Sequence, residues 1–114
     1  MSPRKLAQEI AFRVSDRNAS DITLLDIRQL STIAEFFVIC TATSTVHAKA
    51  LSEDLCRHWN DTHKIRGKSE GSPQEGWVVV DFGSILAHIF LEERRTHYAL
   101  ERLWSDAPVL VQIL

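Results

Sequence analysis

The segment at residues 77–90, which reads WVVVDFGSILAHIF, most constrains how this chain can fold. Two short runs rich in Val, Ile and Phe flank Gly83-Ser84, and such residues favour the pleated strand. A Gly-Ser step between two such runs predicts a β-hairpin, because Gly83 readily adopts the positive φ that a two-residue turn requires. The turn fixes the register, and alternate side chains then share a face. The first face is wholly apolar and is predicted to be core; it consists of Val78, Val80, Phe82, Ile85, Ala87 and Ile89.

The second face of the predicted hairpin mixes large apolar side chains with polar ones. A buried face rarely carries Asp, and a solvated face rarely carries Trp, Phe, Leu and Val together. The pattern therefore leaves two alternatives: a helix of the same chain covers this face, or another protein does. The predicted cross-strand pairs on this face are Trp77 with Phe90, Val79 with His88, and Asp81 with Leu86.

Length and composition indicate one globular domain spanning residues 1–114. The apolar content of 45% and the charged content of 25% are typical of soluble proteins. The net charge of −2 argues against binding nucleic acid through bulk charge, although a basic protein partner remains compatible with it. Two cysteines, Cys40 and Cys56, form no disulfide framework and favour a reducing, cytoplasmic setting. The start of the sequence lacks the apolar region of a signal peptide, and no run reaches the length of a membrane span.

The rest of the chain alternates helical and strand patterns. Ser2-Pro3 predicts a helix start, and Thr43 or Ser44 is expected to cap a second helix at about residues 45–62. Residues 67–76 are expected to be a flexible connection, with a short edge strand starting near Ile65. We predict an α/β fold in which helices flank a mixed β-sheet. The other expected elements are strands at 22–27 and 36–41, one helix from Glu92 through residue 104, and a strand or packed tail at 109–114.

Three short motifs suggest chemistry, but each has a simpler explanation. Asp81-Phe82-Gly83 spells a kinase metal-binding triplet, yet the chain is far too short for a kinase and a hairpin turn accounts for it. Residues 41–45 (TATST) suit an anion at a helix start, although helix capping is the simpler role. Cys56 and His58 lie about 200° apart on a helix, so they and His63 cannot share one metal ion.

Two further groups suggest contacts with a partner. Asp81 and His88 are diagonal neighbours on the second hairpin face and are expected to form a charge-assisted pair or a partner contact. Arg94, Tyr98 and Arg102 are four residues apart, so one continuous helix would align them along one side. That side is either a solvated face or a recognition surface, because Tyr and Arg are enriched in interface hot spots.

Two blocks of the chain resemble the ribosomal silencing factor family, RsfS, also called Iojap. The later block runs DFGSILAHIF, EERRTHYALERLW and DAP, and the earlier block is DITLLDIRQLSTIAEFFVICTATS. The likeness covers residues 6–108. Ala42 stands where the family commonly has Gly, and His47 replaces a more usual Arg or Gln.

The resemblance implies a nucleotidyltransferase-like fold used for binding rather than catalysis, with no cofactor and no metal. It implies a protein that binds the large ribosomal subunit through ribosomal protein L-fourteen, blocks joining of the small subunit under starvation, and in some members forms a homodimer. Membrane binding and direct sequence-specific nucleic-acid binding are not expected. The residues expected to contact the partner are Trp77, Asp81, His88 and Tyr98 on family motif positions, with Phe90, Arg94 and Arg102 beside them.

Two other functions stay open at this point. The first alternative is an assembly factor for the large subunit, as organelle relatives suggest. The second is a nucleotide-using enzyme with a degenerate site. The second alternative would require a site built near Asp26, Thr43, Ser44 and Asp81 that binds nucleotide and Mg²⁺.

Overall fold

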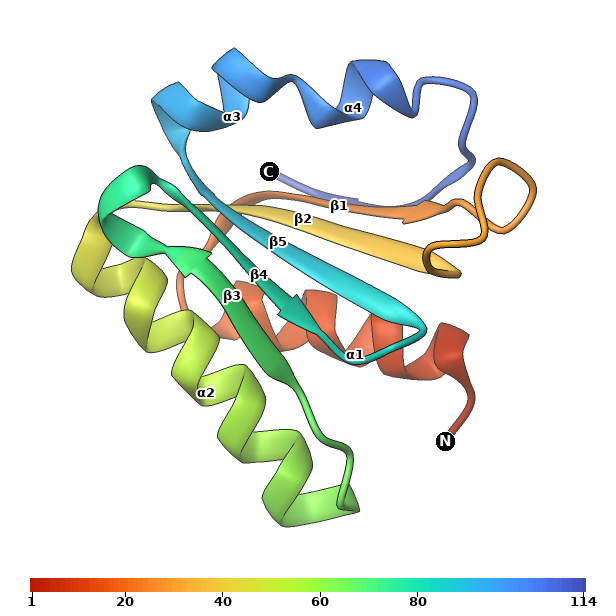
Figure 1. Cartoon of the computed structure of the whole chain (residues 1–114), viewed down its shortest axis with the longest axis horizontal. Coiled ribbons are helices and arrows are strands. Elements are labelled where there is room, and N and C mark those ends of the chain that lie inside the picture. Colours follow the sequence, from red (N-terminus) through yellow and green to blue (C-terminus); the bar gives the residue numbers. More distant parts are fainter.

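The computed structural model describes all 114 residues except the side chain of Tyr98. Six strands form one mixed sheet in the order β3-β4-β5-β2-β1-β6, and helices cover both of its faces (Figure 1). The predicted α/β class is confirmed. The elements in chain order are α1 (Pro3–Asp16), β1 (Ser20–Asp26), β2 (Phe36–Ala42), α2 (Thr45–His63), β3 (Lys68–Ser72), the 3-10 helix η1 (Pro73–Glu75), β4 (Trp77–Asp81), β5 (Ile85–Leu91), α3 (Glu92–Tyr98), α4 (Leu100–Leu103) and β6 (Val109–Ile113).

The centre of the sheet is the parallel pair β2 and β5, and every other neighbouring pair is antiparallel. All seven residues of β2 are buried, as its continuous apolar run predicts. A parallel pair needs a crossover connection, and residues 43–84 supply it through α2, β3 and β4. The crossover places β4 next to β5 and leaves β3 at one edge of the sheet.

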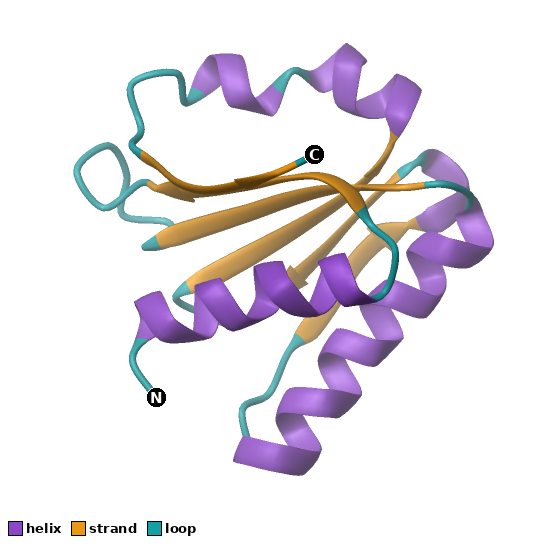
Figure 2. Ribbon diagram, turned by 180° about the vertical axis from the view of Figure 1, so that it is seen from behind, coloured by secondary structure: helices purple, strands orange, loops and turns teal.

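The helices α1 and α2 begin where the capping residues predict. The Ser2 hydroxyl accepts a hydrogen bond from the Lys5 N–H at 3.2 Å, and the Ser44 hydroxyl accepts one from the His47 N–H at 3.0 Å. Both helices lie against the same face of the sheet, which is seen from behind in Figure 2. Their inward stripes are buried as expected and comprise Leu6, Ala7, Ile10, Ala11 and Val14 in α1 and Ala48, Leu51, Leu55 and Trp59 in α2.

The hairpin β4–β5 has the register that its turn predicts. Asp81 lies opposite Leu86, and Trp77 lies opposite Phe90. The turn closes through a hydrogen bond from the Phe82 N–H to the Ile85 carbonyl at 2.9 Å, and Gly83 has a φ of 88°. All six side chains of the first face are buried against α1 and α2. The prediction that this face is core is confirmed.

Two predicted segments differ from the observed ones. Residues 67–76 are not a flexible connection, because β3 and η1 occupy most of them and β3 pairs with β4 along its whole length. The expected single helix from Glu92 is two helices, since Ala99 adopts a left-handed conformation with a φ of 47°. Of the two alternatives for the last residues, the strand is confirmed: Val109–Ile113 forms the edge strand β6.

A second, smaller core lies between the sheet and the pair α3 and α4. This cluster shows that the short helices cover part of the sheet's second face. No helix in the described chain is long and apolar enough to cross a membrane. The buried residues of the smaller core are Leu25, Ile27, Ala34, Phe37, Ile39, Phe90, Leu100 and Ala107.

Candidate partner-binding surface

The second face of the hairpin is covered unequally by the protein's own helices. Phe90 is 0% exposed and His88 is 5% exposed, so both belong to the interior. The side chains of β4 on the same face, including Trp77 and Asp81, are only partly buried. Each of the two alternatives left by the sequence therefore holds for part of this face: the chain's own short helices cover it at Phe90 and His88, which were expected to contact a partner, and leave β4 partly exposed.

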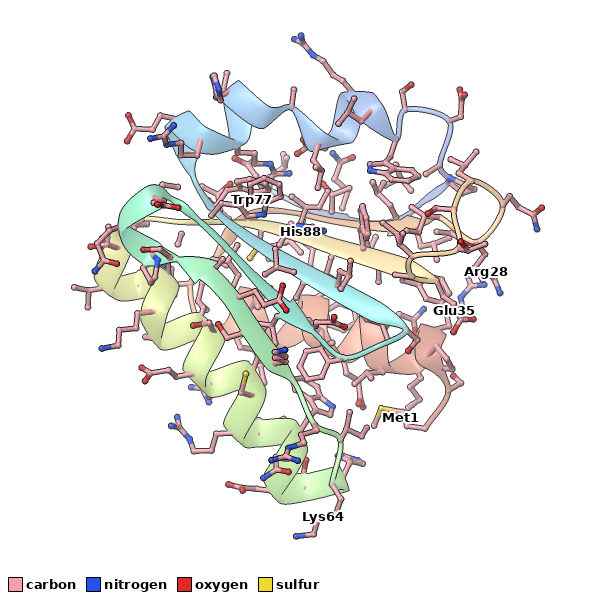
Figure 3. All side chains as sticks on the ribbon, in the orientation of Figure 1. Met1, Arg28, Glu35, Lys64, Trp77 and His88 are labelled. Carbon is pink, nitrogen blue, oxygen red and sulfur yellow. The ribbon has the colours of Figure 1, made fainter. Side chains whose placement is uncertain are left out.

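Trp77 begins β4 and stands half-buried between the small core and the surface. Its ring stacks on Phe90, with ring centroids 5.0 Å apart and an interplanar angle of 26°. Its indole N–H donates a hydrogen bond to Nδ1 of His88 at 3.2 Å. Figure 3 shows the labelled side chains of Trp77 and His88 near each other on the side of the sheet that faces α3 and α4. Two contacts thus hold the indole from the interior side.

His88 is an uncharged interior residue. Burial lowers its pKa from 6.5 to about 4, so the ring is neutral at physiological pH. Its ring meets Phe37 edge-on at a centroid distance of 4.6 Å. The predicted pair between Asp81 and His88 is wrong: the Asp81 carboxylate accepts a hydrogen bond from the Gly83 N–H at 2.7 Å instead. The two residues do lie on the same face of the hairpin, but His88 bonds to Trp77 and Asp81 bonds to the backbone of Gly83.

Beside Trp77 lies a hollow of about 270 Å³. Its lining includes Glu70 and Glu75 together with Val79. The strand register places Lys68 across from Asp81 and Glu70 across from Val79, so β3 extends the same face to the edge of the sheet. We call this region the tryptophan surface and define it by Glu70, Glu75, Trp77, Val79, Asp81 and Leu86.

The charge of the tryptophan surface is negative. It holds three carboxylates, and the nearest cation on the same strand is Lys68, which lies 3.8 Å from Glu70 and is mostly exposed. A surface that combines half-exposed apolar side chains with carboxylates fits a partner carrying Lys or Arg.

Arg94 borders this surface, whereas Arg102 lies elsewhere. Arg94 packs its side chain over Gly76 and lines a hollow together with Glu75. Arg102 belongs to α4 and lines a different hollow. The predicted alignment of Arg94 and Arg102 is therefore wrong, because Ala99 interrupts the helix between them. The side chain predicted to lie between them, that of Tyr98, falls outside the described residues.

Arg95 is a connecting residue that was not among the expected partner contacts. Its guanidinium donates to the Glu101 carboxylate, to the Thr41 hydroxyl at 2.9 Å and to the backbone carbonyl of Asp21. It thereby ties α3 to α4 and to the ends of β1 and β2.

The residues proposed for a degenerate enzyme site do not come together. Asp26 lies beside Phe36 at the start of β2, while Thr43 and Ser44 follow the end of that strand. Seven strand residues separate these positions by about 20 Å. Asp26 is also held by Arg28, whose guanidinium donates to both carboxylate oxygens at 2.9 and 2.7 Å. Within the described residues, no group of three or more His, Cys, Asp or Glu side chains is placed to hold a metal ion.

The fold and this surface define a class: a small α/β domain that carries an acidic surface around a half-buried tryptophan, with no cluster of His, Cys, Asp or Glu placed to hold a metal ion in the described residues. The sequence model of the family described as "Ribosomal silencing factor during starvation" matches residues 1–113. The chain belongs to this ribosomal silencing factor family.

Individual relatives agree with the family assignment. The ribosomal silencing factor RsfS of Halalkalibacterium halodurans is 33% identical over 110 residues, covering 96% of this chain and 94% of the relative. The mouse protein named "Mitochondrial assembly of ribosomal large subunit protein 1" is 36% identical over 92 residues, covering 77% of this chain and 40% of that protein. The crystal structure of a Chromobacterium violaceum protein is 25% identical, with a TM-score of 0.85 over 92% of this chain and 88% of that one.

Proposed function

We propose that this protein silences translation by binding the large ribosomal subunit through ribosomal protein L-fourteen. The bound protein then sterically blocks joining of the small subunit when nutrients are scarce. It acts as a binding protein rather than an enzyme, and its place of action is the cytoplasm, where that subunit would be met. Membership of the ribosomal silencing factor family supports the general role.

The observation that carries the proposal is the incomplete cover over Trp77. This large side chain is half-buried and borders a hollow that Glu70 and Glu75 also line. Ribosomal proteins are basic, so such a surface is complementary in charge to a ribosomal neighbour. Fully burying a large apolar side chain contributes about 1.5–3 kcal/mol, which makes Trp77 the expected anchor.

The surrounding charges have a different expected role. Asp81 is partly exposed at the end of β4, and Arg94 is exposed on the adjoining α3. Charges at the rim of an interface mainly speed association and set specificity, and their effects weaken with salt. Asp81 and Arg94 are therefore proposed as rim contacts, whereas Tyr98 is proposed as a contact only on the family resemblance. Arg102 faces another hollow, and His88 and Phe90 are buried, so these three are not proposed as direct contacts.

The test is sedimentation of the tagged protein with separated ribosomal subunits. We expect the wild type to travel with the large subunit and to reduce the fraction of joined ribosomes. Trp77→Ala should stay folded and lose both effects. A matched control is Phe12→Ala, which removes an aromatic side chain that is 55% exposed on α1, the helix on the opposite side of the sheet. Normal binding by Trp77→Ala would place the interface elsewhere.

A role in assembly of the large subunit is the second candidate. It is favoured by the likeness to the mouse protein whose name describes mitochondrial assembly of the large subunit. Subunit profiles of a deletion strain separate the two roles. Accumulated large-subunit precursors during growth support assembly, whereas altered subunit joining under starvation alone supports silencing.

A homodimer is a further state that we propose for this chain. The edge strand β6 carries no charged residue, and uncharged edge strands are open to pairing with another chain. Sedimentation equilibrium across a concentration series tests it: a constant monomer mass at the highest concentration would rule the dimer out.

A further inference from the structure

We infer that His88 is a positioning residue that fixes the indole of Trp77 with its N–H turned inward, so that the partner meets only the carbon surface of the ring. This inference rests on the proposed function and adds to it the chemistry of the contact. It assigns to His88 an indirect role, because its side chain is 5% exposed and does not reach a partner itself.

The hydrogen bond between the two rings determines the tautomer of His88. An indole N–H is a donor only, so Nδ1 of His88 must accept at the observed 3.2 Å. The proton of the neutral ring therefore resides on Nε2. A ring protonated on Nδ1, or on both nitrogens, would have to give up the bond to Trp77.

The tautomer that accepts from Trp77 leaves the other ring nitrogen of His88 without a partner. Its Nε2 is buried and has no hydrogen-bond partner among the described residues. A buried polar group without a partner is unfavourable and rare in native structures, so each case calls for a reason. Leu or Phe would pack against Phe37 and Phe90 without that penalty. The feature that only a ring nitrogen supplies here is the acceptor for Trp77.

The orientation of the indole then defines what a partner can contact. The N–H points toward the interior, and Phe90 stacks on the ring at 5.0 Å. Apart from this N–H the indole ring is carbon, and Trp77 borders a hollow that Glu70 and Glu75 also line. Such a site takes the aliphatic stem of Lys or Arg over the ring, with the cation placed near the carboxylates. It does not select for a partner group that accepts a hydrogen bond.

The binding test uses two His88 variants and a control. His88→Leu keeps a similar volume but removes the acceptor, and we expect about a three- to ten-fold loss of affinity for the large subunit. His88→Asn places an amide oxygen near the position of Nδ1 and should restore most of the affinity. The control Leu25→Ala loosens the same small core away from Trp77, and should lower stability while leaving the affinity of the folded protein unchanged.

A double-mutant cycle separates positioning from a general loss of packing. Trp77→Phe and His88→Leu each remove the same hydrogen bond, so the double variant should bind no more weakly than the weaker single variant. Fully additive losses would overturn the inference. If His88→Leu binds like the wild type while Trp77→Ala does not, the positioning role fails and the proposed docking surface stands. If both bind normally, the proposed surface itself fails.

A measurement on the unmodified protein keeps the inference testable if His88→Leu does not fold. The ¹⁵N chemical shifts of an imidazole ring report which nitrogen carries the proton. We expect the pattern of a neutral ring protonated on Nε2, together with a slowly exchanging indole N–H from Trp77. A ring protonated on Nδ1, or a rapidly exchanging indole N–H, contradicts the inference.

Discussion

The two faces of the hairpin β4–β5 differ in how completely the protein covers them. On one face, the long helices α1 and α2, of 14 and 19 residues, bury all six side chains. On the other face, α3 and α4 have only 7 and 4 residues, and they bury β5 but leave β4 half open. The contrast shows that one face of a hairpin can be buried along one strand and partly exposed along the next. The length of the helices that cover the face decides where burial ends.

The largest expected effect comes from Phe90, which the sequence alone placed on the surface. Because this ring is 0% exposed, Phe90→Ala should lower the free energy of unfolding by about 3–5 kcal/mol. Chemical denaturation followed by circular dichroism measures the change. A Phe90→Ala protein that is as stable as the wild type would show that the second face is as open at β5 as at β4.

Acidification probes the same small core through His88. Its pKa is about 4 when folded and 6.5 in an unfolded chain, so below pH 6.5 the unfolded chain takes up a proton that the folded protein does not. The contribution of the neutral, buried His88 to the free energy of unfolding is therefore fully present above pH 6.5. It is lost as the pH falls toward 4, by about 3 kcal/mol in total. Urea unfolding across this range measures the decline. His88→Leu should show a shallower dependence, and an unchanged slope would contradict burial of His88.

Asp54 lies in α2 on the covered face of the sheet, and Asp81 lies at the end of β4 on the partly open face, so the two carboxylates can be compared. A hydrogen bond from Arg13, with further attraction from Arg17, lowers the pKa of Asp54, and the contacts to Arg13 measure 2.8 and 2.9 Å. Asp54→Asn should therefore cost about 1–3 kcal/mol of stability at pH 7. Asp81→Asn retains the acceptor for Gly83 and should cost less than about 0.5 kcal/mol.

For binding the order should be reversed, so that Asp81→Asn loses more affinity for the large subunit than Asp54→Asn. Asp81→Asn is expected to weaken association with the large subunit mainly at low salt, because a rim charge acts at long range. Asp54→Asn should bind normally once folded. Equal losses of stability in the two variants, or a binding defect confined to Asp54→Asn, would contradict the proposed difference between the covered face and the partly open face of the sheet.

The smallest expected effect concerns the junction of the two short helices. Ala99 has a φ of 47°, a left-handed conformation that is unfavourable for residues with a Cβ. Ala99→Gly should raise the free energy of unfolding by about 0.5–1 kcal/mol if the junction is retained. A loss of stability would indicate that α3 and α4 prefer to form one continuous helix.

Local chemistry explains which parts of the fold the sequence could predict. The hairpin register was predictable because Gly83-Ser84 sets it within two residues. The helix starts were predictable because Ser2 and Ser44 supply hydroxyl caps. These features depend on neighbours in sequence, so no knowledge of distant segments was needed.

The remaining features depend on distant contacts or on residues with a misleading local preference. Ala99 separates two helices although Ala is the best helix former, and nothing in its local sequence predicts its left-handed conformation. The strand β3 is rich in Gly, Ser and charge, and forms because β4 offers an edge. The exposure of the candidate surface was half predictable: Trp77 is partly exposed as expected, but Phe90 is buried because α3 and α4 return over β5.

The parallel pairing of β2 with β5 has a consequence for synthesis of the chain. The two strands are neighbours in space, but the whole crossover at residues 43–84 must be made before they meet. A nascent chain that has emerged only through α2 therefore carries the entirely apolar β2 with one backbone edge unpaired. Such intermediates are prone to aggregate and to bind chaperones. Slow elongation across the crossover should accordingly lower the yield of folded protein more than an equal delay after residue 91.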